Sequence, residues 1–189
     1  FHSTEGYLNI NANEISDVFA LKAISLLGES LPVAVTDGSD EAARTDVALA
    51  NTFAGIVEFT SGCISEHSIE HALSAFHPEL PHGAGLIMVS KAYYTFIAKS
   101  GTCNDRMIRM AQALGKKDAA DPMDFVEALE ELQAKCGVDN LKMSDYGITP
   151  GEFEDLATNA LETMGGLFAV DPCRITHADI VQILKDSYR

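Results

Sequence analysis

Residues 62–83 read GCISEHSIEHALSAFHPELPHG, and this stretch decides the expected fold. Its first part has the composition and spacing of an α-helix, with apolar residues that return to one face. Pro78 ends that helix, and Pro81 stands where a second helix can begin. The stretch therefore predicts a helix, a tight reversal and a second helix.

Helical spacing continues on both sides of this stretch. An apolar face predicts a helix over 13–28, with Gly28 as its stop. Ser39 or Asp40 can cap the next helix, whose stripe of small apolar residues reaches Val57. Further helices are expected at 62–77, 82–100, 103–114, 121–136, 150–164 and 175–187. Segments 149–152 and 176–179 are helix-start signatures, the second a capping box.

Signals for β-structure are weak. The only candidate strand is 31–35, which is short, contains Pro32 and could equally be a loop. No strand, Gly-rich turn and helix unit for a dinucleotide is present. We therefore expect an all-α chain that forms one helical domain over 1–189.

The composition excludes several functional classes. The chain has 13 Lys and Arg against 28 Asp and Glu, a net charge of −15, which argues against binding to nucleic acid or an anionic membrane surface. No apolar run approaches the roughly 20 residues that span a bilayer, and the first residues lack the features of a signal peptide. The four cysteines are widely spaced, which is typical of reduced thiols in a cytoplasmic protein.

Histidines concentrate in the stretch that decides the fold. His67 and His71 are four residues apart, so both imidazoles project from one face of a helix. The reversal at 77–81 can bring His82 back beside His67. Imidazoles on facing helices form half of a typical site for a borderline divalent metal. A Glu directly after the first histidine, which marks zinc peptidases, is missing.

Three stretches resemble one family. The run E-H-S-I-E-H-A-L, followed by P-H-G, closely resembles the signature of the iron-containing (group III) alcohol dehydrogenases. Segment 2–7 is similar to the end of that family's D-A-x-x-H-x-x-E-(G/A)-Y helix, and segment 171–180 to its N-P-R-x-x-(T/S)-x-x-D-I segment. The resemblance covers essentially the whole chain and implies the all-α bundle domain of the dehydroquinate synthase-like type.

The resemblance implies a set of site residues. The family's three ligand histidines fall on His2, His67 and His82, for Fe²⁺ or Zn²⁺. Its fourth ligand, an aspartate, would lie three residues ahead of Phe1. His71 matches a histidine that the family places against the nicotinamide and that is proposed to relay a proton. The interval from His67 to His82 holds one residue more than in family members with a shorter loop.

The resemblance also implies partners. Family members carry an N-terminal α/β domain that binds NAD or NADP, and nothing similar is present in this chain. We therefore expect the C-terminal domain of an enzyme that transfers hydride between a primary alcohol or aldehyde and nicotinamide, a homo-oligomer at full length. The chain by itself is expected to be inactive.

Other residues leave alternatives open. Glu66 and Glu70 either face solvent or hold imidazole N–H groups. Cys63 favours a buried structural thiol, although with His67 and His71 it would suit a structural zinc site. A stand-alone helical interaction module is the remaining alternative. Minor candidates are His77 in a turn, His177 on the surface and the Gly-bearing apolar loop 164–168 at the substrate pocket. One departure is Asp171-Pro172-Cys173 in place of Asn-Pro-Arg.

Overall fold

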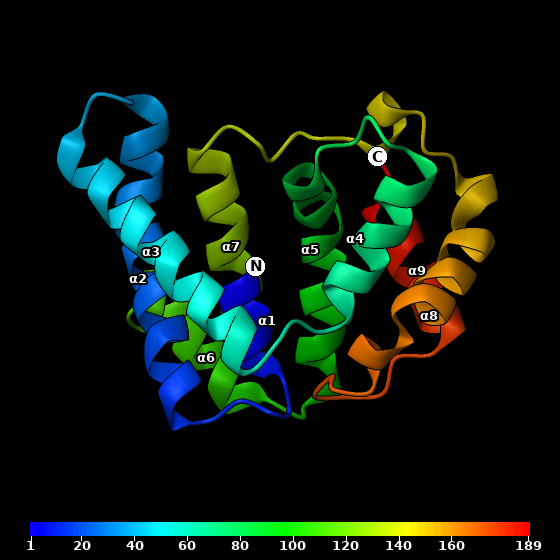
Figure 1. Ribbon diagram of the computed structural model, residues 1–189, viewed down its shortest axis with the longest axis horizontal. Coiled ribbons are helices and arrows are strands. Elements are labelled where there is room, and N and C mark those ends of the chain that lie inside the picture. The colour runs from blue at the N-terminus through cyan, green and yellow to red at the C-terminus, as the bar shows by residue number, and fades with distance from the viewer. The chain divides into compact units, whose positions relative to one another are not determined.

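The computed structural model describes every residue from Phe1 to Arg189 and contains only helices, turns and loops, which confirms the all-α prediction (Figure 1). The helices are α1 (His2–Leu8), α2 (Glu14–Thr36), α3 (Glu41–Thr60), α4 (Ser65–Phe76), α5 (His82–Ser100), α6 (Asn104–Ala113), α7 (Met123–Lys135), α8 (Phe153–Phe168) and α9 (His177–Ser187). Two short 3₁₀ turns, η1 (Met143–Tyr146) and η2 (Pro150–Glu152), precede α8.

The helices form two compact units. The first unit comprises residues 1–63 and 103–139, and it holds α1, α2, α3, α6 and α7. The second unit comprises residues 64–102 and 140–189, and it holds α4, α5, the two 3₁₀ turns, α8 and α9. That the whole chain acts as one domain stays a prediction.

In the first unit, α1 is tied to its neighbours by Arg106 of α6. Arg106 Nε donates to the Tyr7 carbonyl at 2.6 Å, and the guanidinium lies 3.8 Å from the centroid of the Tyr7 ring. Its other nitrogens hold both carboxylate oxygens of Asp17 on α2. Gly6 lets α1 approach α3 closely, because a Cβ there would lie 2.3 Å from Val57 Cγ1. These contacts fix the helix on which His2 stands.

Helix α2 corrects the sequence reading. The expected stop at Gly28 and the expected strand or loop at 31–35 are both wrong, since α2 continues to Thr36. A Cβ at Gly28 would lie 2.8 Å from the Leu114 carbonyl oxygen, so glycine serves close packing there and does not end the helix. Pro32 has no N–H, so the helix continues without a bond to the Gly28 carbonyl. Packing of α2 along α3 outweighs both local signals.

The length and composition of α2 would also suffice to cross a membrane, contrary to the reading of the sequence. Its mean hydropathy is 1.6 over an 18-residue window, 28% of which is buried. Core helices of soluble proteins meet the same criterion, and α2 buries Ala23 and Leu26 against Ala50 of α3. Its apolar character is therefore explained in part by packing within the first unit.

In the second unit, α4 packs against α5 on one side and α8 on the other, and α9 contacts both α5 and α8. The α4–α5 hairpin predicted from residues 62–83 is confirmed, with a short loop from His77 to Pro81. Ser68 Oγ donates to the Ala160 carbonyl at 2.8 Å and joins α4 to α8. The hairpin that carries most of the histidines is therefore held inside one packed unit.

The caps expected from sequence are present. Asp40, rather than Ser39, caps α3 through its bond from the Ala43 amide. Reciprocal capping boxes join Thr149 with Glu152 and Thr176 with Asp179. The predicted end of α8 at residue 164 corresponds to a kink at Met164 (φ −133°, ψ 33°), but segment 165–168 beyond it is helical and not the expected loop.

Candidate metal centre

The N-terminus of α4, the helix that carries His67 and His71, is capped by a residue from a distant part of the chain. The N-cap residue Ile64 has no side chain that can accept a hydrogen bond, and Asp171 supplies the missing acceptor from 106 residues away. Asp171 Oδ1 accepts from the Ser65 amide at 3.0 Å and from the Tyr93 hydroxyl at 3.1 Å. The substitution of Asp for the family's Asn thus stands where it caps the helix that carries His67 and His71.

The Asp171 carboxylate is poorly placed to be charged. Its side chain is buried, and Oδ2 has no hydrogen-bond partner. Burial raises the pKa of Asp171 to about 6, although the hydrogen bonds from Ser65 and Tyr93 oppose the rise. Protonation of Asp171 therefore falls within the range of mildly acidic solutions.

Three of the four histidines that the sequence singled out come together in the second unit. The ring centroids of His67 and His82 lie 5.2 Å apart, those of His71 and His82 5.4 Å and those of His67 and His71 6.2 Å. His67 is almost fully buried, whereas His71 and His82 are exposed. The hairpin therefore places an imidazole cluster between the first half of α4 and the start of α5.

The surroundings of His71 favour its neutral form. Burial lowers the pKa of His71, and the neighbouring rings of His82 and His67 lower it further, while the Glu70 carboxylate opposes the fall. His71 is therefore neutral at pH 7, and a neutral ring has one nitrogen that can bind a metal or accept a proton.

Both glutamates of the motif are buried, so the solvent-facing alternative is wrong. Tyr94 donates its hydroxyl to Glu66 Oε2 at 2.5 Å. Glu70 accepts from Ser74 Oγ at 2.5 Å, and its other oxygen is paired with His82 Nδ1. Glu70 thus contacts an imidazole nitrogen, in line with the other alternative, and Glu66 accepts from a tyrosine hydroxyl.

His2 lies on α1 of the first unit. Its Nδ1 is 3.5 Å from Glu58 Oε2 on α3, and its side chain is 37% exposed. The second nitrogen of the ring, Nε2, is the natural donor atom for a ligand role. The assignment of His2 to the same metal as His67 and His82 stays a prediction.

The remaining sequence candidates have local roles. His77 bonds through Nε2 to Glu152 at 3.0 Å and ties the hairpin loop to η2. His177, in the first turn of α9 as expected, lies 3.0 Å from Thr158 Oγ1. Cys63 is only partly buried, less than expected of a core thiol, and its carbonyl accepts from the Asn9 side chain at 3.0 Å.

Sequence reasoning missed two residues that hold the site. Arg106 gives no local signal, because its partners Tyr7 and Asp17 lie 99 and 89 residues away. In the sequence Asp171 stands out only as a departure from a family pattern. The apolar residue Ile64 at the α4 cap is the single hint that an acceptor must come from elsewhere.

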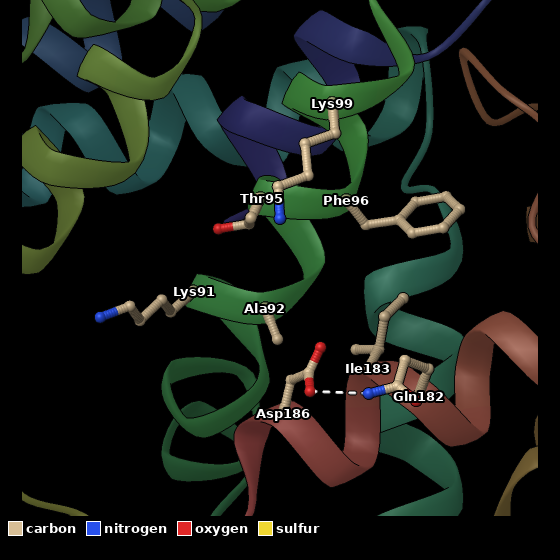
Figure 2. A pocket seen from close by; sticks show the side chains of 8 residues that line it. All are labelled: Lys91, Ala92, Thr95, Phe96, Lys99, Gln182, Ile183 and Asp186. Atoms are coloured by element: carbon tan, nitrogen blue, oxygen red, sulfur yellow. Dashed lines mark hydrogen bonds between the residues drawn. The ribbon is translucent and has the colours of Figure 1, made fainter.

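A cavity of about 360 Å³ lies between α5 and α9 (Figure 2). Lys91, Lys99 and Phe96 of α5 line one side, and Ile183 and Asp186 of α9 line the other. Gln182 donates to Asp186 across one turn of α9 at 2.7 Å. None of the histidines lines this cavity, so it is separate from the candidate metal centre.

Comparisons with known proteins agree with the motifs and the fold. The chain is 30% identical to alcohol dehydrogenase 4 of Saccharomyces cerevisiae and to long-chain-alcohol dehydrogenase 1 of Geobacillus thermodenitrificans, matches that cover 99% of this chain and 48% and 47% of the relatives. The fold is similar to an archaeal halo-thermophilic alcohol dehydrogenase from a Red Sea brine pool (TM-score 0.92, 26% identity, 98% of this chain and 48% of that one). It is also similar to an alcohol dehydrogenase from Oenococcus oeni (TM-score 0.89, 26% identity, 99% and 49%).

The chain spans about half the length of the curated relatives that it matches. The model of the Fe-containing alcohol dehydrogenase family, C-terminal part, matches residues 1–188. The helical architecture, the motifs and this match agree, and the chain therefore belongs to the iron-containing alcohol dehydrogenase family as its C-terminal region.

Proposed function

We propose that this chain is the metal-binding part of a metal-dependent alcohol dehydrogenase linked to NAD or NADP. The reaction is hydride transfer between a primary alcohol or aldehyde and nicotinamide. His2, His67 and His82 are the proposed ligands from this chain, and His71 is the proposed residue next to the nicotinamide. The observation that carries the proposal is the cluster of His67, His71 and His82 rings, with centroids 5.2 to 6.2 Å apart.

The donor set fits a borderline divalent metal. Imidazole nitrogens bind both Fe²⁺ and Zn²⁺, and the Zn–N distance is about 2.0 to 2.1 Å. The type of ligand therefore does not distinguish iron from zinc. A bound metal of this kind supplies Lewis-acid chemistry at the oxygen of an alcohol or aldehyde. His71, neutral because its pKa is lowered, can take a proton from the hydroxyl side and pass it toward solvent, to which its ring is exposed.

The other half of the active site is proposed to come from an N-terminal nucleotide-binding domain, which relatives of twice this length can accommodate. A homo-oligomer and a cytoplasmic location belong to the same proposal. With no nucleotide-binding unit among the helices, the 189-residue chain by itself should oxidise no alcohol with NAD or NADP. Measurable turnover would contradict this assignment of roles.

The metal proposal is tested by titrating the purified chain with Zn²⁺ in a calorimeter. We expect binding that His67→Ala and His82→Ala weaken at least tenfold, because each removes a ligand. His177→Ala is the matched control, since the partners of this histidine, Thr158 and Glu154, lie outside the imidazole cluster, and it should leave the affinity unchanged.

Two further outcomes decide between the alternatives. Loss of binding in Cys63→Ala together with unchanged binding in His82→Ala would favour a structural zinc site of Cys63, His67 and His71. No binding by the unmodified chain, and no change in any variant, would favour a helical interaction module and overturn the metal proposal.

A further inference from the structure

Glu70 is a buried carboxylate for which the proposed function gives no role. It stands on α4 directly before His71, and its side chain is completely buried. An ionised carboxylate in the interior is costly unless each oxygen accepts a hydrogen bond. Both oxygens have hydrogen-bond partners here: Oε1 accepts from Ser74 Oγ, and Oε2 is paired with His82 Nδ1. The buried Glu70 side chain is therefore engaged at both oxygens.

The opposite helix makes room for this carboxylate. Gly85 of α5 faces Glu70, and a Cβ at that position would lie 2.7 Å from both Cγ and Oε1 of Glu70. The backbone of Gly85 has no positive φ, so conformation does not require glycine there. The absence of a side chain at residue 85 leaves the space that the Glu70 carboxylate occupies.

The Glu70–His82 pair differs from three other contacts between histidines and carboxylates in this chain. The partners of His2, His77 and His177 are Glu58, Glu152 and Glu154, whose side chains are 51%, 30% and 72% exposed. Water competes for such exposed carboxylates, and their pairs contribute little. Glu70, at 0% exposure, has no competing water and can dictate the state of the ring that it contacts.

We propose that Glu70 is a positioning residue that holds His82 as the Nδ1–H tautomer in one ring orientation, so that Nε2 is the atom offered to a divalent cation. An ionised carboxylate only accepts hydrogen bonds, so the shared proton belongs to Nδ1. A neutral ring then carries its lone pair on Nε2. Carboxylates hold metal-binding histidines in this way and raise their basicity.

The role of Nε2 as a ligand atom rests on the proposed function, whereas the tautomer does not. A competing arrangement is available, since donor atoms of Glu70, His71 and His82 lie within 4.8 Å of one another and could hold a cation directly. In that arrangement Glu70 is a ligand, and the proposal is wrong.

The tautomer is measured by nitrogen NMR on the whole chain without metal, labelled with ¹⁵N-histidine, at about pH 8, where unperturbed imidazoles are neutral. His82→Gln assigns the signals. We expect His82 with a protonated Nδ1 and an unprotonated Nε2, and a mixture of tautomers in Glu70→Met, which keeps the volume and removes both acceptors. Ser74→Ala is the matched control, because it removes the donor to the other oxygen and should leave His82 unchanged.

The tautomer of His82 in the unmodified chain tests the proposal even if Glu70→Met fails to fold. A proton on Nε2 of His82 would overturn the proposal. An unchanged tautomer in a folded Glu70→Met variant would also overturn it. Glu70→Gln keeps one acceptor oxygen without the charge, so it should retain the Nδ1–H tautomer. A shift to the Nε2–H form in this variant would be a further contradiction.

Zinc titration of the same proteins tests the link to metal. Glu70→Met should lower Zn²⁺ affinity by about 10- to 100-fold, as for other outer-sphere partners, and Ser74→Ala by far less. On addition of Zn²⁺ the Nε2 signal of His82 should move while Nδ1 keeps its proton. Loss of that proton, or unchanged affinity in Glu70→Met, overturns the positioning role. A chain that binds no zinc but shows the expected tautomer overturns only the proposed function.

Discussion

Replacement of Asp171 by Asn should change how the stability of the chain depends on pH. Asn keeps the Oδ1 acceptor for the Ser65 amide and the Tyr93 hydroxyl, and it carries no charge at any pH. The unmodified chain must ionise a buried carboxylate whose Oδ2 has no hydrogen-bond partner. The two proteins therefore differ mainly in the cost of that charge.

The size of the effect follows from the pKa of Asp171, which burial raises from 3.8 to about 6. A raised pKa in the folded chain means that folding favours the protonated acid, so this contribution is fully present below pH 3.8 and is lost as the pH rises through about 6. A rise of roughly two units, at about 1.36 kcal/mol per unit, gives about 3 kcal/mol in all. About 2 kcal/mol of this is lost between about pH 4 and 7.5.

Urea unfolding followed by circular dichroism at a series of pH values measures this difference. We expect the free energy of unfolding of Asp171→Asn, relative to the unmodified chain, to rise by about 2 kcal/mol between about pH 4 and 7.5. The buried amide adds a cost that is independent of pH and does not alter this slope. Asp155→Asn, an exposed control on α8, should show no such trend. A constant difference between Asp171→Asn and the unmodified chain would refute the reasoning.

Three further substitutions test the contacts around the site. Arg106→Lys removes the paired bonds to Asp17 and should lower the free energy of unfolding by about 1 to 2 kcal/mol, measured by urea denaturation. Salt screens charges, so the loss should be smaller in high salt than in low salt, and an equal loss in both would contradict a charge-assisted tie. Gly85→Ala places a methyl group against Glu70 and should lower the melting temperature. It should also change the tautomer of His82, as measured by NMR of the ¹⁵N-histidine-labelled chain, and an unchanged spectrum would contradict the packing argument. Ser68→Ala deletes one buried bond between α4 and α8 and should cost about 1 kcal/mol, with an intact His82 signal as the sign that the hairpin itself persists.

The parts of the fold that were predictable from sequence are those set by neighbours in the chain. The α4–α5 hairpin follows from Pro78, Pro81 and helical spacing, and the capping box at Thr176 and Asp179 needs only four consecutive residues. Gly28 and Pro32 misled because their local signals were outweighed by packing on Leu114 and α3. Local sequence patterns contain no information about packing partners that are distant in sequence.

The candidate site likewise has features that were predictable from sequence and features that were not. Spacing alone indicated that His67 and His71 share a face and that the reversal returns His82, and the structure confirms this convergence. The burial of Glu70 could not be predicted, because it depends on a missing side chain at Gly85 on the next helix. The placement of His2 was implied by family resemblance, and no local pattern supports it.

The cap on α4 also orders events during synthesis. The Ser65 amide is made 106 residues before the Asp171 carboxylate that accepts its hydrogen bond. At about 5 to 20 residues per second, a ribosome needs roughly 5 to 20 s to cover that interval. During that time the nascent helix with His67 and His71 lacks its native terminal acceptor, and its cap is completed only after Asp171 has been added.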